Sequence, residues 1–287
     1  MAQSPVSAIL LISCPDGPGL VAAVTDFVFS HNGNILQLDQ HVDQQENVFF
    51  MRIEWDMTGF SLDRDTVEVA FAPLAKFYEM DWQLHFSDTR TKMVLFVSKQ
   101  SHVLYDVLSR WQSGEFQVDI PLIVSNHDTL ATVAQQFDIP FRVFSINKEN
   151  KAAVEQEQIA LLDDIQPDLI VLARYMQIIT DDFIQHYPSQ IINIHHSFLP
   201  AFIGARPYHQ AFARGVKIIG ATSHYVTADL DAGPIIEQDV ARVTHKDSVR
   251  SMVRKGQDLE KTVLSRAVYY HLQHRILVYN NKTVVFD

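Results

Sequence analysis

The sequence predicts an α/β protein in two parts, a small βαββαβ unit followed by a larger, mostly parallel and doubly wound sheet. Three observations support this prediction. Residues 1–86 carry strand and helix patterns in the order β-α-β-β-α-β. Residues 87–91 (SDTRT) are polar and contain no apolar side chain, which is typical of a linker. From residue 92 to residue 287 strands alternate with helices, and such alternation places helices on both faces of a parallel sheet.

The elements of the first part follow from apolar patterning and turn residues. The run VSAILLISC is apolar almost throughout and ends at Pro and Gly, as a buried strand does before a turn. Apolar residues at helical spacing and a stop at Asn32-Gly33 predict the helix that follows. The expected elements are strands at 6–14, 34–42, 48–55 and 80–86 and helices at 20–31 and 63–78. Their order is that of the ferredoxin-like unit.

The second part contains short apolar strands separated by amphipathic helices. We expect strands at 93–98, 120–125, 141–144, 169–172 and 191–194, with helices at 101–111, 129–137 and 151–165. Two further strands, 217–226 and 235–243, read as an antiparallel pair around a Gly-Pro loop, and they precede a long helix at 248–272 and a hairpin at 276–279 and 283–286. In open sheets of this kind, ligands bind outside the carboxyl ends of the strands.

Composition limits the classes of function. The chain has 34 acidic and 23 basic residues, a net charge of −11, which argues against nucleic acid as the main partner. The single cysteine, Cys14, excludes an internal disulfide and fits a reducing compartment. We see no secretory signal, and no apolar run approaches the ~20 residues of a membrane span. We therefore expect a cytoplasmic protein without a membrane partner.

Polar residues interrupt the strand at 191–195 in a pattern that predicts a site. Asn193 and His195 point to the same face, because alternate side chains of a strand share a face. His224 and the turn residue Asp231 follow, and an amide, an imidazole and a carboxylate together suit acid–base chemistry. The alternative is a buried histidine that bonds a backbone carbonyl, with an ordinary turn aspartate.

A metal site is the competing chemistry. A zinc set can be drawn from His195, His196, His209 and His224 with Asp231. Their spacing matches no short ligand pattern such as His-Glu-x-x-His, and catalytic zinc sites usually have a close ligand pair on one element. We expect no metal and no other cofactor.

The same stretch resembles the folate-dependent formyltransferase family, and the resemblance covers the chain from about Lys92 to its end. The matching residues are Asn193, His195, Ser197, Leu199, Pro200, Gly204, His224, Asp231, Gly233 and Pro234. The resemblance implies that Asn193 stabilises an oxyanion, that Asp231 orders a water, and that His195 is the acid–base group. It implies that the folate substrate is bound by Arg174, Tyr175, Met176, Gly204, His224 and Val226. Arg174 would meet the glutamyl tail or remain solvated.

The first part resembles the ACT domain, a small-molecule-sensing module. The matching segments are PDGPGLV at 15–21 and Gly-Asn-Ile at 33–35. The resemblance implies a homo-oligomer that binds an amino-acid effector such as glycine or methionine through Asp16, Gly19 and Asn34. The alternative is a domain that only dimerises.

The acceptor of the formyl group decides the reaction. Glycinamide ribonucleotide transformylases carry a glycine-rich phosphate loop after their first strand, whereas this chain has SKQSHVL at 98–104, without glycine. Here the chain is similar to the deformylase branch, although Ala232 stands where deformylases more often have Glu. The resemblance implies hydrolysis of 10-formyltetrahydrofolate to formate and tetrahydrofolate. Formyl transfer to an amine is the alternative, and a non-catalytic amino-acid-responsive binding protein is a more distant one.

Overall fold

The computed structural model describes residues 5–201 and 207–286, and the chain divides into two compact units. The first unit extends to Thr89 and includes Gln273–Tyr279 and the residues from Val284. The second unit contains Arg90–Leu272 and Asn280–Thr283. The sequence-based division assigned the whole C-terminal segment to the second part.

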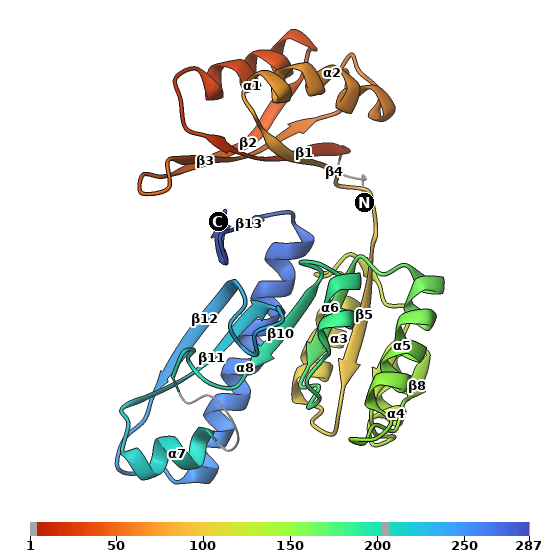
Figure 1. Cartoon of the computed structure of the whole chain (residues 1–287), viewed down its shortest axis with the longest axis vertical. Helices are drawn as coiled ribbons and strands as arrows, with labels where there is room; N and C mark the ends of the chain where they lie inside the picture. The colour runs from red at the N-terminus through yellow and green to blue at the C-terminus, as the bar shows by residue number, and fades with distance from the viewer. Residues whose placement is uncertain (1–4, 202–206, 287) are drawn as a thin grey trace. The chain divides into compact units, whose positions relative to one another are not determined.

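The first unit is an antiparallel sheet with two helices on one face (Figure 1). Its elements are β1 (Ser7–Pro15), α1 (Leu20–Ser30), β2 (Asn34–Asp43), β3 (Val48–Asp56), α2 (Arg64–Phe77) and β4 (Asp81–Phe86). The strand order β2-β3-β1-β4 is that of the ferredoxin-like fold, which confirms the predicted fold class of this part. Alternate residues of β1 and β3, among them Leu10, Ile12 and Trp55, pack with Val24 and Phe71 of the helices.

The opposite face of this sheet is also buried, because the C-terminal residues of the chain cover it. Leu11 and Phe50 form an apolar cluster with Leu277 and Phe286. On the same face as Phe50, the side chain of Arg52 is 2% exposed and pairs with Glu54 at 2.8 Å. Its guanidinium also donates to the backbone carbonyls of residues 273 and 274. Strand β1 is therefore buried along nearly its whole length because segments distant in the sequence cover both of its faces.

The second unit contains an eight-stranded mixed sheet. Its elements are β5 (Thr91–Val97), α3 (His102–Gln112), β6 (Val118–Asp119), β7 (Ile123–Ser125), α4 (Ala131–Gln136), β8 (Phe141–Val143), α5 (Lys151–Ile165), β9 (Leu169–Ala173), α6 (Asp181–His186), β10 (Ile191–His195), α7 (Pro207–Arg214), β11 (Ile218–Tyr225), β12 (Ile235–Arg242) and α8 (Val249–Leu272). The short strands β13 (Ile276–Tyr279) and β14 (Lys282–Val285) end the chain as a two-stranded hairpin.

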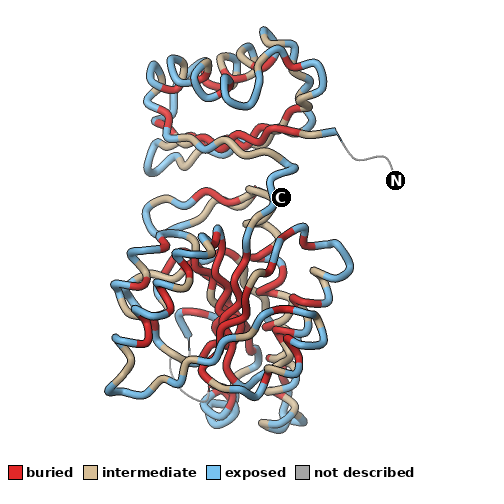
Figure 2. The backbone as a smooth tube through the Cα atoms, turned by 90° about the vertical axis from the view of Figure 1, so that its right-hand side faces the viewer, coloured by how far each residue is buried: buried red, intermediate tan, exposed pale blue. Residues whose placement is uncertain are grey.

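Strands β8, β7, β5, β9 and β10 are parallel neighbours in that order, and β11 and β12 extend the sheet antiparallel. One face of β5 and β9 packs on Ile159 of α5 and Phe183 of α6. Helix α8 packs on β10, β11 and β12 and on α3. The strands at the centre of this sheet form the buried band of the second unit in Figure 2, whereas the edge strands β8 and β12 are largely intermediate or exposed. The predicted doubly wound, mostly parallel sheet is therefore confirmed, whereas α6 and α7 had no predicted counterpart.

The chain order of the strands reverses between β5 and β9. From β5 the chain passes to β7 and β8 on one side and then crosses to β9 on the other. Ligand sites of open α/β sheets lie outside the carboxyl ends of the strands at such a switch point. The segments that leave β9 and β10 at this edge carry the residues described next.

Candidate active site

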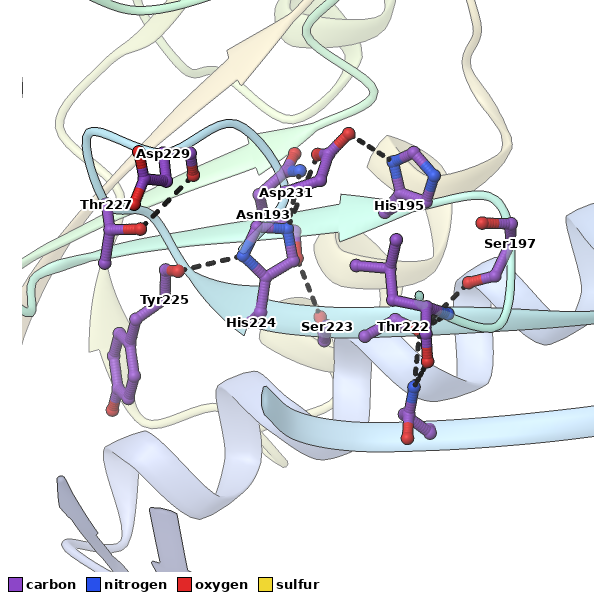
Figure 3. Close-up of polar contacts among 12 residues, drawn as sticks. Asn193, His195, Ser197, Thr222, Ser223, His224, Tyr225, Thr227, Asp229 and Asp231 are labelled. Atoms are coloured by element: carbon purple, nitrogen blue, oxygen red, sulfur yellow. Dashed lines mark hydrogen bonds and ion pairs between the residues drawn. The ribbon is translucent and has the colours of Figure 1, made fainter. Parts of the chain in front are cut away.

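The pairing of β10 with β11 brings the polar residues of both strands together (Figure 3). Asn193 lies directly opposite His224 in the antiparallel register, so both side chains project from one face. The Nδ2 atom of Asn193 is 3.2 Å from Nε2 of His224. His195 projects from the same strand two residues later, as the alternation predicts.

Asp231 contacts His195 from the loop between β11 and β12. Its Oδ2 atom lies 3.2 Å from Nδ1 of His195, and Oδ1 lies 3.7 Å from Nε2 of His224. Burial opposes ionisation of Asp231, but the hydrogen bond from His195 holds the pKa of this carboxyl below its usual range. Asp231 is therefore a carboxylate that holds the Nδ1 side of the His195 ring. The buried Nε2 atom of His195 has no hydrogen-bond partner among the described residues.

The loop that carries Asp231 is shaped by its own sequence. Asp231 has a φ of 56°, a left-handed conformation that Asp adopts more readily than most residues. A Cβ atom at Gly233 would lie 1.9 Å from the carbonyl oxygen of Tyr225, so only glycine fits there. Asn281 donates from its side chain to the carbonyl of Ala232 at 2.8 Å. These contacts place the carboxylate before any ligand binds.

His224 orients Asn193. Its Nδ1 atom lies 2.8 Å from the carbonyl oxygen of Tyr225, which only accepts, so Nδ1 carries the hydrogen. In the neutral ring Nε2 is then an acceptor, and it takes one amide hydrogen of Asn193. The second amide hydrogen of Asn193 is left to point toward a ligand. His224, predicted to bind substrate, therefore contacts a predicted catalytic residue.

A cavity of about 390 Å³ opens over these groups. Its lining includes the predicted residues Arg174, Tyr175, Met176, Asn193, His195, His224, Val226 and Asp231. Met176, Ile178 and Leu230 are more than half exposed and add apolar surface to its walls. A cavity of this size with apolar walls and a few convergent polar groups is typical of a small-molecule site.

The segment after β9 is fixed in place by a serine at the end of β5. The backbone N–H of Met176 donates to Oγ of Ser98 at 2.9 Å, and Ser98 donates to Oδ1 of Asn126 at 2.6 Å. Arg174 begins this segment with a φ of 62°. Neither residue was predicted to belong to the site: Ser98 was considered only as part of the segment 98–104, and Asn126 belongs to no recognisable motif.

The remaining predicted residues lie elsewhere. Gly204 is outside the described residues. Asp16 and Gly19 lie in the turn after β1, and Asn34 begins β2; all three are exposed. In the register of the sheet, Asn34 pairs with Asp56 while the end of β1 pairs with Val48, eight residues or roughly 27 Å away along β3. One copy of the chain therefore does not bring the three residues together.

Several buried polar residues beside the cavity meet at Glu260, a residue that was not predicted. Glu260 of α8 is 1% exposed and contacts His102, Arg174 and Tyr208. Glu260 shares its helix face with Met252, Gly256, Val263, Leu264 and Ala267, all buried. A lone carboxylate on the apolar stripe of a helix is the sequence signal that identifies it.

Within residues 5–201 and 207–286, no group of three or more His, Cys, Asp or Glu side chains is arranged to hold a metal ion. The same part of the chain contains no helix with the length and apolar character of a membrane span.

Comparison with known proteins identifies the family of this chain. Residues 91–268 match the family model described as formyl transferase. A formyltetrahydrofolate deformylase of Synechocystis is 56% identical over 281 residues, 98% of this chain and 99% of the relative. The crystal structure of a formyltetrahydrofolate deformylase from Pseudomonas syringae superimposes with a TM-score of 0.97 at 48% identity, over 100% of this chain and 96% of the other.

Glycinamide ribonucleotide transformylase 1 of Symbiobacterium toebii is more distant. It has a TM-score of 0.66 and 25% identity, and the match covers 71% of this chain and 98% of that one. The fold of the second unit is thus shared by enzymes of different name, whereas the two units together match the deformylases. By sequence and by fold over its full length, the chain belongs to the formyltetrahydrofolate deformylase family.

Proposed function

We propose that this protein hydrolyses 10-formyltetrahydrofolate to formate and tetrahydrofolate. The observation that carries the proposal is the pair of Asp231 and His195, 3.2 Å apart, beside the amide of Asn193. Its geometry is that of a carboxylate, an imidazole and an oxyanion donor gathered at one end of a cavity. The names of the relatives agree with this reaction.

The cavity suits a flat aromatic substrate. The segment 174–179 and the loop 226–231 line it with Met176, Ile178 and Leu230, which offer apolar surface to the pterin and aminobenzoyl rings. The backbone of Met176 is already held by Ser98, so this wall is ordered before the substrate arrives. A substrate seated there places its formyl group toward Asn193 and His195.

In the proposed reaction, Nε2 of His195 takes a proton from water as the water oxygen attacks the formyl carbon. Asp231 stabilises the imidazolium through Nδ1, and the amide hydrogen of Asn193 that His224 leaves unused donates to the oxyanion. The tetrahedral intermediate then breaks its bond to N10, and His195 returns the proton to that nitrogen. Formic acid releases its proton to solvent, so the sum is water plus substrate giving tetrahydrofolate, formate and a proton.

Water is the acceptor that the site supports. Two polar side chains of the segment after β5 are bound to the protein itself, since Ser98 contacts Met176 and Asn126 and Gln100 contacts Arg174. This segment contains no glycine that would let backbone N–H groups surround a phosphate. A phosphorylated amine acceptor therefore has no glycine-rich backbone cradle here.

The test is formate release from 10-formyltetrahydrofolate by the purified protein without any amine, followed by the same assay with added glycinamide. We expect steady formate production that the amine does not increase. Formyl transfer to the amine, with no formate in its absence, would replace hydrolysis by the transferase reaction. Binding of tetrahydrofolate without any turnover would show that the protein is a non-catalytic binding protein.

We further propose that the enzyme works in the cytoplasm without a bound cofactor, as a homo-oligomer that responds to glycine or methionine. Asp16 and Gly19 of one copy and Asn34 of another would form the effector site, because one chain holds them at opposite ends of β3. Asp16→Asn should remove any change of rate caused by the amino acid. The exposed Asp26→Asn of α1 is the matched control. A response of unchanged size in Asp16→Asn would rule out this effector site.

A further inference from the structure

Glu260 is a buried carboxylate with both oxygens bound. Oε1 accepts from the hydroxyl of Tyr208 at 2.9 Å, and Oε2 lies 2.8 Å from Nε2 of His102 and 3.4 Å from Nε of Arg174. Arg174 also donates to Oε1 of Gln100 at 3.2 Å. We call these five residues, Gln100, His102, Arg174, Tyr208 and Glu260, the Glu260 cluster. They come from four segments that share no sequence neighbourhood.

The charge states within the cluster are defined by its contacts. Burial opposes ionisation of Glu260, but the hydrogen bond from His102 and the charge of Arg174 hold its pKa below the usual range. Burial and the neighbouring Glu260 raise the pKa of Tyr208, which therefore remains a donor. Glu260 and Arg174 form a pair of opposite charges, 1% and 7% exposed.

Two features of the Glu260 cluster make the fold less stable than an apolar core would. Buried ion pairs rarely stabilise a protein more than apolar side chains of the same size would. Gly256, one turn before Glu260 on α8, makes room for Tyr208: a Cβ atom there would lie 1.9 Å from the hydroxyl oxygen. A glycine inside a helix destabilises it by about 1 kcal/mol relative to alanine. Such a cost suggests a role other than holding the fold together.

The cluster lies next to the proposed reaction centre. Arg174 lines the cavity together with His195 and His196. The ring of His196 has its centroid 5.2 Å from that of His195 and 6.1 Å from that of Tyr208. Burial and the charge of Arg174 lower the pKa of His196 to about 4, while Glu260 acts in the opposite direction. A net charge in the Glu260 cluster would therefore change the electrostatic potential at the His195 ring.

We propose that Glu260 is a positioning residue of this active site, which fixes the Arg174 guanidinium beside the cavity and balances its charge near His195. The inference rests on the proposed function, because the imidazolium of His195 forms only during the reaction. Without Glu260, the uncompensated positive charge of Arg174 repels the imidazolium of His195. This repulsion raises the free energy of the transition state, in which the imidazolium is present, and leaves that of the bound substrate unchanged.

Charge-neutral variants test this role. Glu260→Gln keeps the shape and removes the charge, and it should lower kcat about tenfold or more while KM changes less than threefold. The double variant Glu260→Gln with Arg174→Gln removes both charges and should turn over faster than Glu260→Gln alone. A cluster that only fills space would make the double variant slower than either single variant, and that result would overturn the proposal.

Two further variants keep the test decisive if Glu260→Gln folds poorly, which its thermal melting will show. Tyr208→Phe removes only one hydrogen bond to Glu260 and should lower kcat by roughly threefold. Asp258→Asn, an exposed carboxylate of the same helix that pairs with Lys261, should match the wild type. Equal rates in Tyr208→Phe, Glu260→Gln and wild type would also overturn the proposal.

A measurement that does not depend on turnover distinguishes failure of this inference from failure of the proposed function. In spectra of the protein with ¹⁵N-labelled histidine, Arg174→Gln should raise the pKa of His196 from about 4, and Glu260→Gln should lower it. The charged and titratable groups that face His196 are Arg174, Glu260, His195, Asp231 and the Tyr208 hydroxyl. Absence of formate release by the wild type would overturn the proposed function, whereas an unmoved His196 would overturn the charge balance.

Discussion

The Nδ1 atom of His195 lies 3.2 Å from Oδ2 of Asp231, although one residue ends β10 and the other belongs to the loop before β12. The contact leaves the buried Nε2 atom of His195 without a partner among the described residues, at the wall of the cavity. An imidazole held from one side by a carboxylate and unpaired on the other is arranged for proton transfer.

Asp231→Asn should remove most turnover. The amide cannot stabilise the imidazolium of His195, and a loss of roughly 10⁴ in kcat accompanies the equivalent change in a Ser-His-Asp triad. Steady-state formate release measures the loss, and equilibrium binding of tetrahydrofolate should change little. Asp229→Asn, an exposed carboxylate in the same loop, is the matched control and should keep the wild-type rate. An Asp231→Asn enzyme of undiminished rate would contradict the assignment.

Asn193→Ala should lower kcat by about 10²–10³ with a smaller change in KM, because it removes one donor to the oxyanion. His224→Gln should have a smaller effect in the same direction, since it removes the ring that orients the Asn193 amide. The two changes combined should lower kcat less than the product of their separate effects. Full additivity would show that His224 does not act through Asn193.

Gly233→Ala should both destabilise the protein and displace Asp231. The new Cβ atom would meet the carbonyl oxygen of Tyr225 at 1.9 Å, and overpacking of this kind costs about 1–3 kcal/mol. We expect a lower melting temperature and a loss of formate release of at least about tenfold. Gly17→Ala, where nothing lies within 4 Å of the added atom, is the control. Equal melting temperatures for the two variants would exclude the predicted clash.

The first unit should lose stability as the pH falls below 6.5. Burial lowers the pKa of His85 from 6.5 to about 4, so between these values the unfolded chain binds a proton that the folded chain does not. The free energy of unfolding should then fall by up to about 1.4 kcal/mol per pH unit, with no contribution above 6.5. His85→Phe retains a ring to stack on His274, 3.7 Å away, and should flatten this slope in urea titrations. An unchanged slope would show that His85 does not cause it.

The local sequence pattern was enough to predict most of the strands and helices that hold the site. Apolar runs and turn residues predicted the strands and helices of both units, because each element buries a face whose period is visible in the chain. The i, i+2 spacing placed Asn193 and His195 on one face of β10. The order of elements then restricted the site to the carboxyl edge of the larger sheet.

The tertiary structure decided which distant residues meet. The antiparallel register of β10 and β11 set Asn193 against His224, and a loop shaped by Gly233 brought Asp231 to His195. The packing of α8 placed Glu260 against Arg174. In the first unit, the C-terminal residues of the chain cover the second face of the sheet. Local sequence fixes the period and direction of side chains within an element. Contacts between elements depend on register and packing, which no local pattern encodes.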